Sequence, residues 1–179
     1  MKNIYLLGFM GSGKTTTGRA LAKKLGRPFA DTDLLVEKLS GLPVAAFIQQ
    51  RGLKAFRAAE NAVFKTIVRS AGRVIALGGG IMPTRARKPR LKKSGVTVYL
   101  ECGASALFKR LLKNPAGRPL ISGGPEQAKR KIARLLKKRR PYYEKADLKL
   151  DTSRLTPEAA AVKIRKLLGR LIRIAPGRL

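Results

Sequence analysis

A glycine-rich loop near the start of the chain has the spacing of a phosphate-binding site. Residues 8–15 follow the pattern Gly-x-x-x-x-Gly-Lys-Thr, directly after a short apolar run and directly before a helical pattern. Glycines let successive backbone N–H groups converge on phosphate oxygens, and the helix presents the positive end of its dipole to the same charge. The residues that we expect to bind the phosphates of ATP are Gly11, Ser12, Gly13, Lys14, Thr15 and Thr16.

Two side chains of this loop have the chemistry for phosphoryl transfer. Lys14 supplies a point charge for the β- and γ-phosphates, and the hydroxyl of Thr15 is placed to coordinate Mg²⁺. The loop by itself indicates only a nucleotide, because switches, motors, transporters and small-molecule kinases all use it. The second substrate has to be inferred from other residues.

Two carboxylates, Asp31 and Asp33, follow the second predicted strand. Ligands of open parallel sheets bind at the carboxyl ends of the strands. In strand geometry residues i and i+2 point the same way, so both side chains could face one pocket. Asp31 would then serve Mg²⁺ through water, and Asp33 would receive or orient an acceptor hydroxyl. The alternative is that Asp33 caps the next helix.

Further along the chain, an ion-pair spacing and a glycine triplet could contribute to the same pocket. Arg57 and Glu60 share a helical face at i, i+3 spacing, which suits a surface ion pair equally well. Gly78, Gly79 and Gly80 follow the third predicted strand, where their N–H groups can donate directly to an oxyanion or hydroxyl. The alternative for the glycines is a flexible turn.

Two arginines complete the candidate residues. Arg118 lies in residues 114–124, where glycines and prolines exclude a regular element, and we predict a mobile lid there. Arg139 begins the run Arg-Arg-Pro-Tyr-Tyr. The planar fork of arginine suits carboxylate and phosphate recognition, but with 40 basic residues a single arginine is weak support for a site.

The elements that must position these residues alternate between strand and helix. Five short apolar or β-branched runs predict parallel strands at residues 3–7, 28–31, 73–77, 96–100 and 148–151. Apolar residues recur at helical spacing between them. We therefore predict an α/β fold in which helices cover both faces of a five-stranded parallel sheet. Residues 1–179 form one domain in this prediction, with the acceptor-binding region at about residues 33–60.

Composition limits the classes of protein. With 44% hydrophobic and 28% charged residues the chain is typical of a globular protein, and no apolar run approaches the roughly 20 residues of a membrane span. The single cysteine, Cys102, cannot form an internal disulfide, and no histidine is present to activate it. We expect a cytoplasmic protein. The net charge of +30 indicates either a polyanionic partner or a generally basic surface.

Taken in order, these motifs resemble those of the shikimate kinase family, from about residue 3 to about residue 168. The ordered segments are residues 8–15, 29–33 with Glu37, 56–60, 78–80, 118–120, 139–143 and 151–152. The order is what makes the resemblance specific, because each later motif alone would be weak. It implies a P-loop kinase fold with three layers, and transfer of the γ-phosphoryl of MgATP to the 3-hydroxyl of shikimate, in the pathway to aromatic amino acids.

The resemblance also implies roles for single residues. Asp33 would orient the acceptor hydroxyls or act as the base, Arg57 and Arg139 would hold the carboxylate, and Gly79 and Gly80 would bind through their backbone. Lys14, Thr15 and Asp31 would serve phosphate and Mg²⁺, Arg118 would meet the transferring phosphoryl group, and Arg110 would pack on adenine. A monomer is implied. The chain departs from the family at Leu53, where a glutamate is usual, and in its charge.

Two other functions remain possible at this stage. A gluconate-type kinase would share the loop but has no need of the later motifs. A nucleic-acid-binding P-loop protein would explain the charge, but it predicts a concentrated basic face with aromatic platforms, and aromatic residues make up only 6% of the chain. Without a specific partner, weak and salt-sensitive binding of nucleic acid is expected from charge alone.

Overall fold

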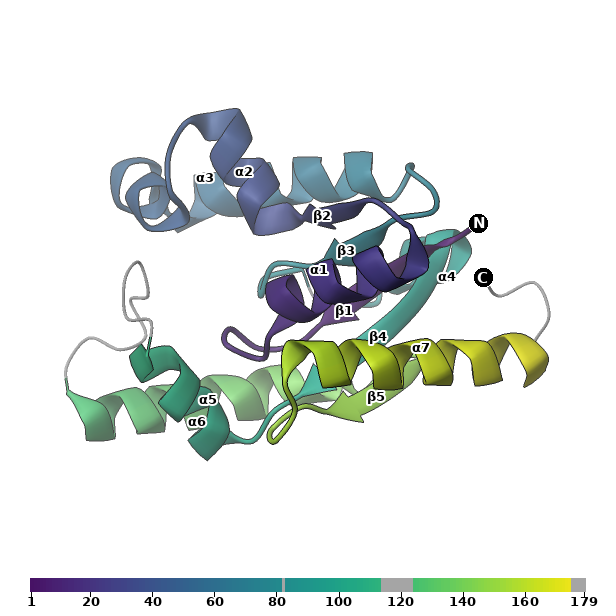
Figure 1. Ribbon diagram of the computed structural model, residues 1–179. Coiled ribbons are helices and arrows are strands. Elements are labelled where there is room, and N and C mark those ends of the chain that lie inside the picture. Colours follow the sequence, from purple (N-terminus) through teal and green to yellow (C-terminus); the bar gives the residue numbers. More distant parts are fainter. Residues whose placement is uncertain (82, 114–123, 175–179) are drawn as a thin grey trace.

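The computed structural model describes residues 1–81, 83–113 and 124–174. Strands and helices alternate along most of this length, as the sequence predicts (Figure 1). Their order is β1 (Asn3–Leu7), α1 (Lys14–Leu25), β2 (Phe29–Asp31), α2 (Thr32–Ser40), α3 (Val44–Ile67), β3 (Val74–Ala76), α4 (Lys88–Ser94), β4 (Gly95–Glu101), α5 (Ala104–Lys113), α6 (Pro125–Tyr143), β5 (Leu148–Asp151) and α7 (Pro157–Ile174).

The five strands form one parallel sheet in the order β2-β3-β1-β4-β5. All five predicted strands are confirmed, and the first and last have the predicted bounds. β4 is longer by one residue at each end, because Asn3 pairs with Gly95 and Glu101 pairs with Asp151. The strand order reverses between β1 and β3, which is the switch point where ligands of such sheets bind.

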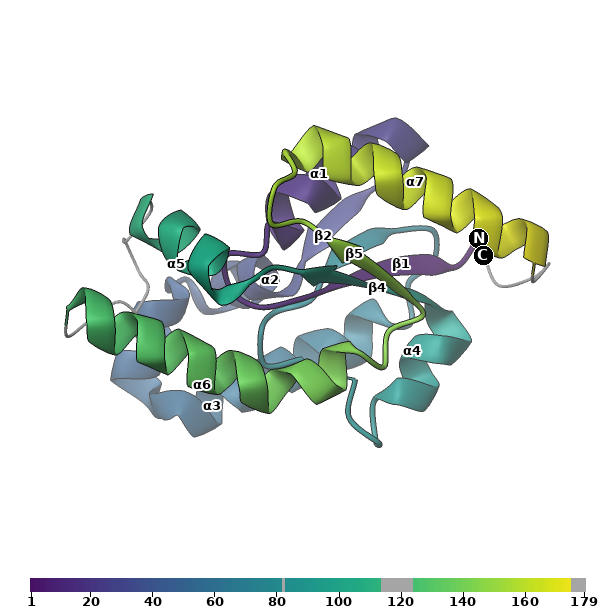
Figure 2. The same cartoon turned by 90° about the horizontal axis from the view of Figure 1, so that it is seen from below.

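Alternate residues of the strands face two different helical layers. On one side, Ile4 and Leu6 of β1 pack in the same cluster as Leu21 of α1 and Ile164 of α7. On the other side lie Tyr5 and Leu7, in the cluster that includes residues of α3, α4, α5 and α6. Figure 2 shows α1 and α7 on one side of the sheet and α3, α4 and α6 on the other. The central strands are therefore buried on both faces, as their nearly continuous apolar sequence predicts.

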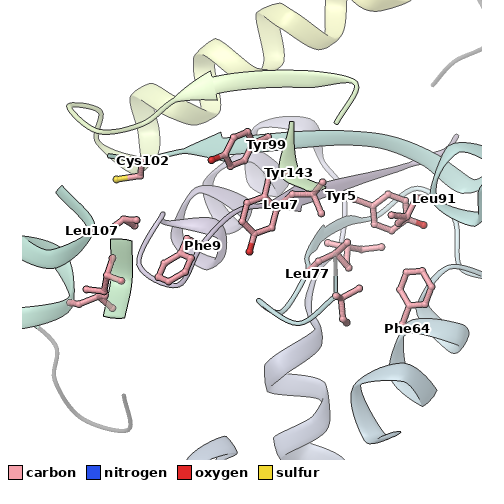
Figure 3. Packing of buried hydrophobic residues seen from close by; sticks show 14 of the residues in the cluster. Tyr5, Leu7, Phe9, Phe64, Leu77, Leu91, Tyr99, Cys102, Leu107 and Tyr143 are labelled. Atoms are coloured by element: carbon pink, nitrogen blue, oxygen red, sulfur yellow. The ribbon is translucent and has the colours of Figure 1, made fainter. Parts of the chain in front are cut away.

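The larger of these clusters contains several aromatic residues. The rings of Tyr99 and Tyr143 stack with centroids 5.2 Å apart, and Phe9 lies in the same cluster (Figure 3). Cys102 is also buried there, and burial raises the pKa of its thiol. A small apolar residue at a strand end therefore describes Cys102 better than a nucleophile does.

The helices α2 and α3 form an arm with a small apolar cluster of its own. Val36 of α2 packs with Phe47, Phe56 and Val63 of α3. α3 is interrupted at Gly52, whose φ of 78° and ψ of 160° are not helical. This bend lies within the stretch of residues 33–60 that the sequence predicts to bind the acceptor. No helix in the described part of the chain is both long and apolar enough to span a membrane.

Candidate active site

The predicted phosphate loop lies between the carboxyl end of β1 and the start of α1. Its backbone turns tightly, since Ser12 N donates a 3.1 Å hydrogen bond to the carbonyl of Phe9 and Gly13 has a φ of +91° that favours glycine. Lys14 donates to the carbonyl oxygens of Gly8 (3.0 Å) and Phe9 (3.1 Å). The ammonium group is thus held against the loop whose N–H groups are to receive phosphate.

Asp31 connects this loop to the acceptor side. Its Oδ2 accepts a 2.7 Å hydrogen bond from the hydroxyl of Thr15, and its Oδ1 accepts a 3.0 Å hydrogen bond from the backbone N–H of Asp33. Asp31 is therefore the N-cap of α2. Oxygens of the Thr15 hydroxyl and the Asp31 carboxylate stand together, as the prediction of a shared Mg²⁺ site requires.

The strand-geometry argument for Asp33 is wrong, although its predicted location is confirmed. The strand ends at Asp31, and Asp33 lies in the first turn of α2. The alternative role of Asp33 as a helix cap is also wrong, because Asp31 is the N-cap of α2. Both carboxylates nevertheless line the same cleft, because the N-terminus of α2 lies at the carboxyl edge of the sheet.

The half-buried carboxylate of Asp33 has its pKa raised from 3.8 to about 6. Burial is the largest cause, and the charges of Asp31 and Glu60 act in the same direction. Lys14 and Arg57 oppose them. A carboxylate with a pKa in this range is ionised at neutral pH and is more basic than an ordinary aspartate, which suits a group that accepts or shares a hydroxyl proton.

The glycine triplet provides space for side chains of the site. A Cβ on Gly78 would overlap the carboxylate of Asp33, and one on Gly80 would overlap the guanidinium of Arg57. A Cβ on Gly79 would lie 3.0 Å from Nη1 of Arg139. None of the three has a positive φ. Close approach of side chains, more than backbone freedom, is what these positions require of glycine.

The predicted pair between Arg57 and Glu60 forms, but Glu60 is not at the surface. The Glu60 side chain is only 2% exposed, and its Oε2 accepts from Arg57 Nη1. Glu60 Oε1 is buried without a hydrogen-bond partner among the described residues. The Arg57 guanidinium remains partly exposed beside Gly80. The sequence was equally compatible with an ion pair at the surface. Tertiary packing buries Glu60 instead, so that its carboxylate supports the Arg57 guanidinium.

Arg139 reaches the site from α6. Its guanidinium carbon lies 5.5 Å from the centre of the Phe9 ring, and Nη1 approaches Gly79. Phe9 belongs to the phosphate loop, so this stacking places Arg139 between the phosphate loop and the glycine triplet. The structure thus brings Arg139 to the side of the cleft that carries Asp33 and Gly79.

Arg110 of α5 also lines the cleft. Its guanidinium donates hydrogen bonds to the carbonyls of Ser12 and Thr152. The hydroxyl of Thr152 donates a 3.3 Å hydrogen bond to the same Ser12 carbonyl. Arg110 is therefore in contact with the phosphate loop, and its packing on adenine stays a prediction. The predicted lid at residues 114–124, with Arg118, lies outside the described residues except for Gly124.

The cleft has a volume of about 800 Å³, and Arg110, Arg139 and the phosphate loop all line it. Its lining includes residues to which no sequence motif assigns a role, namely Met10, Thr17, Glu37, Pro43, Val44, Ala45, Thr152, Leu155, Pro157 and Ala160. Glu37 belongs to a segment of the family resemblance. Thr152 directly follows the fifth strand, so the same rule of strand carboxyl ends that selected Asp31 could have selected it. The remaining residues carry no sequence pattern that points to a ligand.

Known proteins resemble this chain in sequence and in structure. The model of the family described as shikimate kinase matches residues 10–169. A shikimate kinase of Thermodesulfovibrio yellowstonii is 43% identical over 96% of this chain and 97% of its own length. The solved structure of shikimate kinase from Acinetobacter baumannii in complex with shikimate is 33% identical, with a TM-score of 0.87 over 95% of this chain and 94% of that one.

A second solved structure agrees with the first. Shikimate kinase from Bacteroides thetaiotaomicron is 30% identical, with a TM-score of 0.86 over 94% of this chain and 98% of its own. The family match covers residues 10–169 and so includes Asp33, Arg57 and Arg139. The chain therefore belongs to the shikimate kinase family.

Proposed function

We propose that the protein transfers the γ-phosphoryl group of ATP to the 3-hydroxyl of shikimate, giving shikimate 3-phosphate and ADP. The observation that carries this proposal is the convergence of Asp33, Gly79 and Arg139 in one cleft with Lys14. A hydroxylated carboxylic acid offers matching groups, since its hydroxyl suits Asp33 and its carboxylate suits an arginine. Residues 1–179 act as one catalytic unit in this proposal.

The donor side holds and neutralises the phosphates. Backbone N–H groups of residues 11–16 and the ammonium of Lys14 bind the β- and γ-phosphates. Arg110 borders the adenine side through its contacts with Ser12 and Thr152. Arg118, from the segment outside the described residues, would meet the phosphoryl group as its charge develops.

The oxygens of Thr15 and Asp31 fit Mg²⁺. They are hard ligands joined by a 2.7 Å hydrogen bond beside the phosphate loop. No group of three metal-binding side chains occurs among the described residues, but Mg²⁺ normally keeps several waters and phosphate oxygens and needs only one or two protein ligands. When bound, the ion would offset phosphate charge and orient the γ-phosphoryl group.

The acceptor side positions the attacking hydroxyl. Arg57 and Arg139 hold the carboxylate of the acid, and the N–H groups of Gly79 and Gly80 donate to its oxygens. The acceptor hydroxyl lies against Asp33. Its oxygen forms the new bond to the γ-phosphorus while the bond between that phosphorus and the bridging oxygen of ADP breaks, and the hydroxyl proton passes to Asp33. We place the reaction in the cytoplasm, because its reducing conditions keep thiols such as that of Cys102 free.

Assays of ADP release with shikimate, quinate, gluconate and nucleoside monophosphates test the proposal. Turnover that depends on shikimate is expected. Robust turnover on gluconate or a nucleoside monophosphate, with none on shikimate, would overturn it.

A further inference from the structure

A second hollow, about 700 Å³ in volume, lies at the opposite edge of the sheet from the ATP cleft. Its lining comes from the start of β1, the end of α3 with the turn that follows, and α4. Figure 1 places the N-terminus and α4 together, away from the loop between β1 and α1. β1 separates the two sites by its full length of about 16 Å, at roughly 3.3 Å per residue. The hollow is therefore separate from the ATP cleft.

Basic side chains line this hollow from two walls. Lys2, just before β1, also lines the hollow. Lys65 and Arg69 stand on the α3 side, and Arg90 and Lys93 stand on α4. None of the ion pairs in the described part of the chain involves any of these four side chains. The lining contains no carboxylate, and the sequence has no aspartate or glutamate anywhere from residue 61 to residue 100.

Helix dipoles explain only part of this cluster. Cations are favoured near helix C-termini, which accounts for Lys65 in the last turn of α3 and Lys93 in the last turn of α4. Arg69 lies beyond the end of α3, and Arg90 lies early in α4, where the dipole does not favour a cation. Like charges around one hollow repel one another unless an anion lies between them.

A buried polar network fixes the distance between the two walls. Asn3, which is 0% exposed, donates to the carbonyl of Ser70 (2.7 Å) and to the hydroxyl of Tyr5 (3.0 Å). The Tyr5 hydroxyl is hydrogen-bonded in turn to Ser94 Oγ at 2.7 Å, at the end of α4. β1, the turn after α3 and the end of α4 are thus joined below the hollow. The basic walls are held apart instead of being free to rearrange on the surface.

We propose that this hollow is a binding site for a chain of linked phosphate groups, held by Lys65, Arg69, Arg90 and Lys93. Several cations in a row suit several phosphates better than one small anion, and arginines add forked donors for phosphate oxygens. No aromatic side chain lines the hollow, so bases have nothing to stack on and only the phosphates are contacted. Inorganic polyphosphate and the backbone of single-stranded nucleic acid both present this chemistry.

The test compares two variants with the same loss of charge. The site variant carries Lys65→Gln, Arg69→Gln, Arg90→Gln and Lys93→Gln. The control carries Arg134→Gln, Lys137→Gln, Lys163→Gln and Arg165→Gln, which are exposed positions on α6 and α7. Binding of fluorescent polyphosphate and of an oligothymidine of about 10 nucleotides is measured with saturating Mg²⁺, ADP and shikimate, so that the ATP cleft is filled.

The site variant should lose about tenfold or more in affinity at physiological salt. The slope of its log affinity against log salt concentration should become shallower by about 3, because each of the four lost phosphate contacts contributes about 0.7 to the slope. The control variant should bind like the parent, and both variants should keep kinase turnover. Preference for polyphosphate or for oligothymidine would identify the source of the phosphates. Equal weakening of the two variants, or no binding by the parent at physiological salt, would overturn the proposal.

Discussion

The hydroxyl of Thr15 donates a 2.7 Å hydrogen bond to Asp31, the residue that caps the helix carrying Asp33. Thr15 belongs to the helix that follows the phosphate loop, and Asp33 belongs to the acceptor side. One contact therefore sets the donor side against the acceptor side. A change at Thr15 should affect metal use as well as this alignment.

Thr15→Val should lower kcat by about 100-fold and raise the Mg²⁺ concentration needed for half-maximal rate, because it removes one oxygen ligand while keeping the shape of the side chain. Titration of turnover with Mg²⁺ measures both. Thr15→Ser keeps the oxygen and serves as the matched control, so an equal loss in Thr15→Ser would contradict a role for the hydroxyl.

Asp33→Asn should lower kcat by at least about 100-fold, the usual contribution of a positioned base, with little change in ATP affinity. The same substitution should raise the melting temperature at pH 7. Burial disfavours the charged carboxylate, and asparagine carries no charge to desolvate. Steady-state kinetics, ATP titration and thermal unfolding measure the three quantities. Retained turnover would show that Asp33 is misassigned.

The pH dependence of stability should distinguish the parent from Asp33→Asn. Because the pKa of Asp33 is raised to about 6 in the folded protein, the native state binds its proton more tightly than the unfolded state, where the pKa is 3.8. The stability contributed by this group therefore falls as pH rises from about 4 to about 6 and stays low above that. The stability gained by Asp33→Asn should be full at pH 7 and absent near pH 4.

The same pKa predicts the acid limb of activity. If Asp33 accepts the hydroxyl proton, kcat/KM for shikimate should rise through pH 6 and reach a plateau above pH 7. A rate that is flat between pH 5 and pH 8, with binding of both substrates unchanged, would leave Asp33 only an orienting role.

Gly80→Ala should raise KM for shikimate by about tenfold or more, since the added Cβ displaces the Arg57 guanidinium. The fold should survive, because Gly80 does not need a positive φ. Gly169→Ala in α7 is the control: nothing lies within 4 Å of the position of its Cβ, and alanine favours a helix. Acceptor kinetics and circular dichroism check both variants. An unchanged KM in Gly80→Ala would rule out this use of the glycine.

Tyr143→Phe should weaken shikimate binding without weakening the fold. The Tyr143 hydroxyl is buried and lacks a properly aligned hydrogen-bond partner among the described residues. Burial raises the pKa of this hydroxyl, and the nearby charge of Arg139 opposes that rise. Removal of the hydroxyl should leave the melting temperature equal or higher, because the phenylalanine variant no longer buries an unpaired hydroxyl group. The KM for shikimate should rise severalfold while the KM for ATP stays constant. A fall in stability with unchanged KM would contradict a positioning role for Tyr143.

The sequence alone predicted the elements and the donor side of the site. Apolar runs bounded by glycine or polar residues specify strands locally, so all five strands could be predicted. The phosphate loop is a contiguous motif whose geometry depends on its own residues. The rule of strand carboxyl ends predicted Asp33 and the glycine triplet on the acceptor side, and the family resemblance added the carboxylate role of Arg57 and Arg139. The segment carrying Arg118 lies outside the described residues, so its role as a lid stays a prediction.

Only the tertiary structure decided how these residues meet. Whether Arg57 and Glu60 form a surface pair or a buried support depends on what packs over Glu60, and no local pattern records that. The raised pKa of Asp33 also depends on burial and on the charges of four residues, of which only Asp31 is close to it in the chain. The sequence by itself predicted a phosphate-binding loop next to β1. The fold determined which side chains meet there, because contacts between residues distant in the chain are set by packing of the whole sheet and its helices.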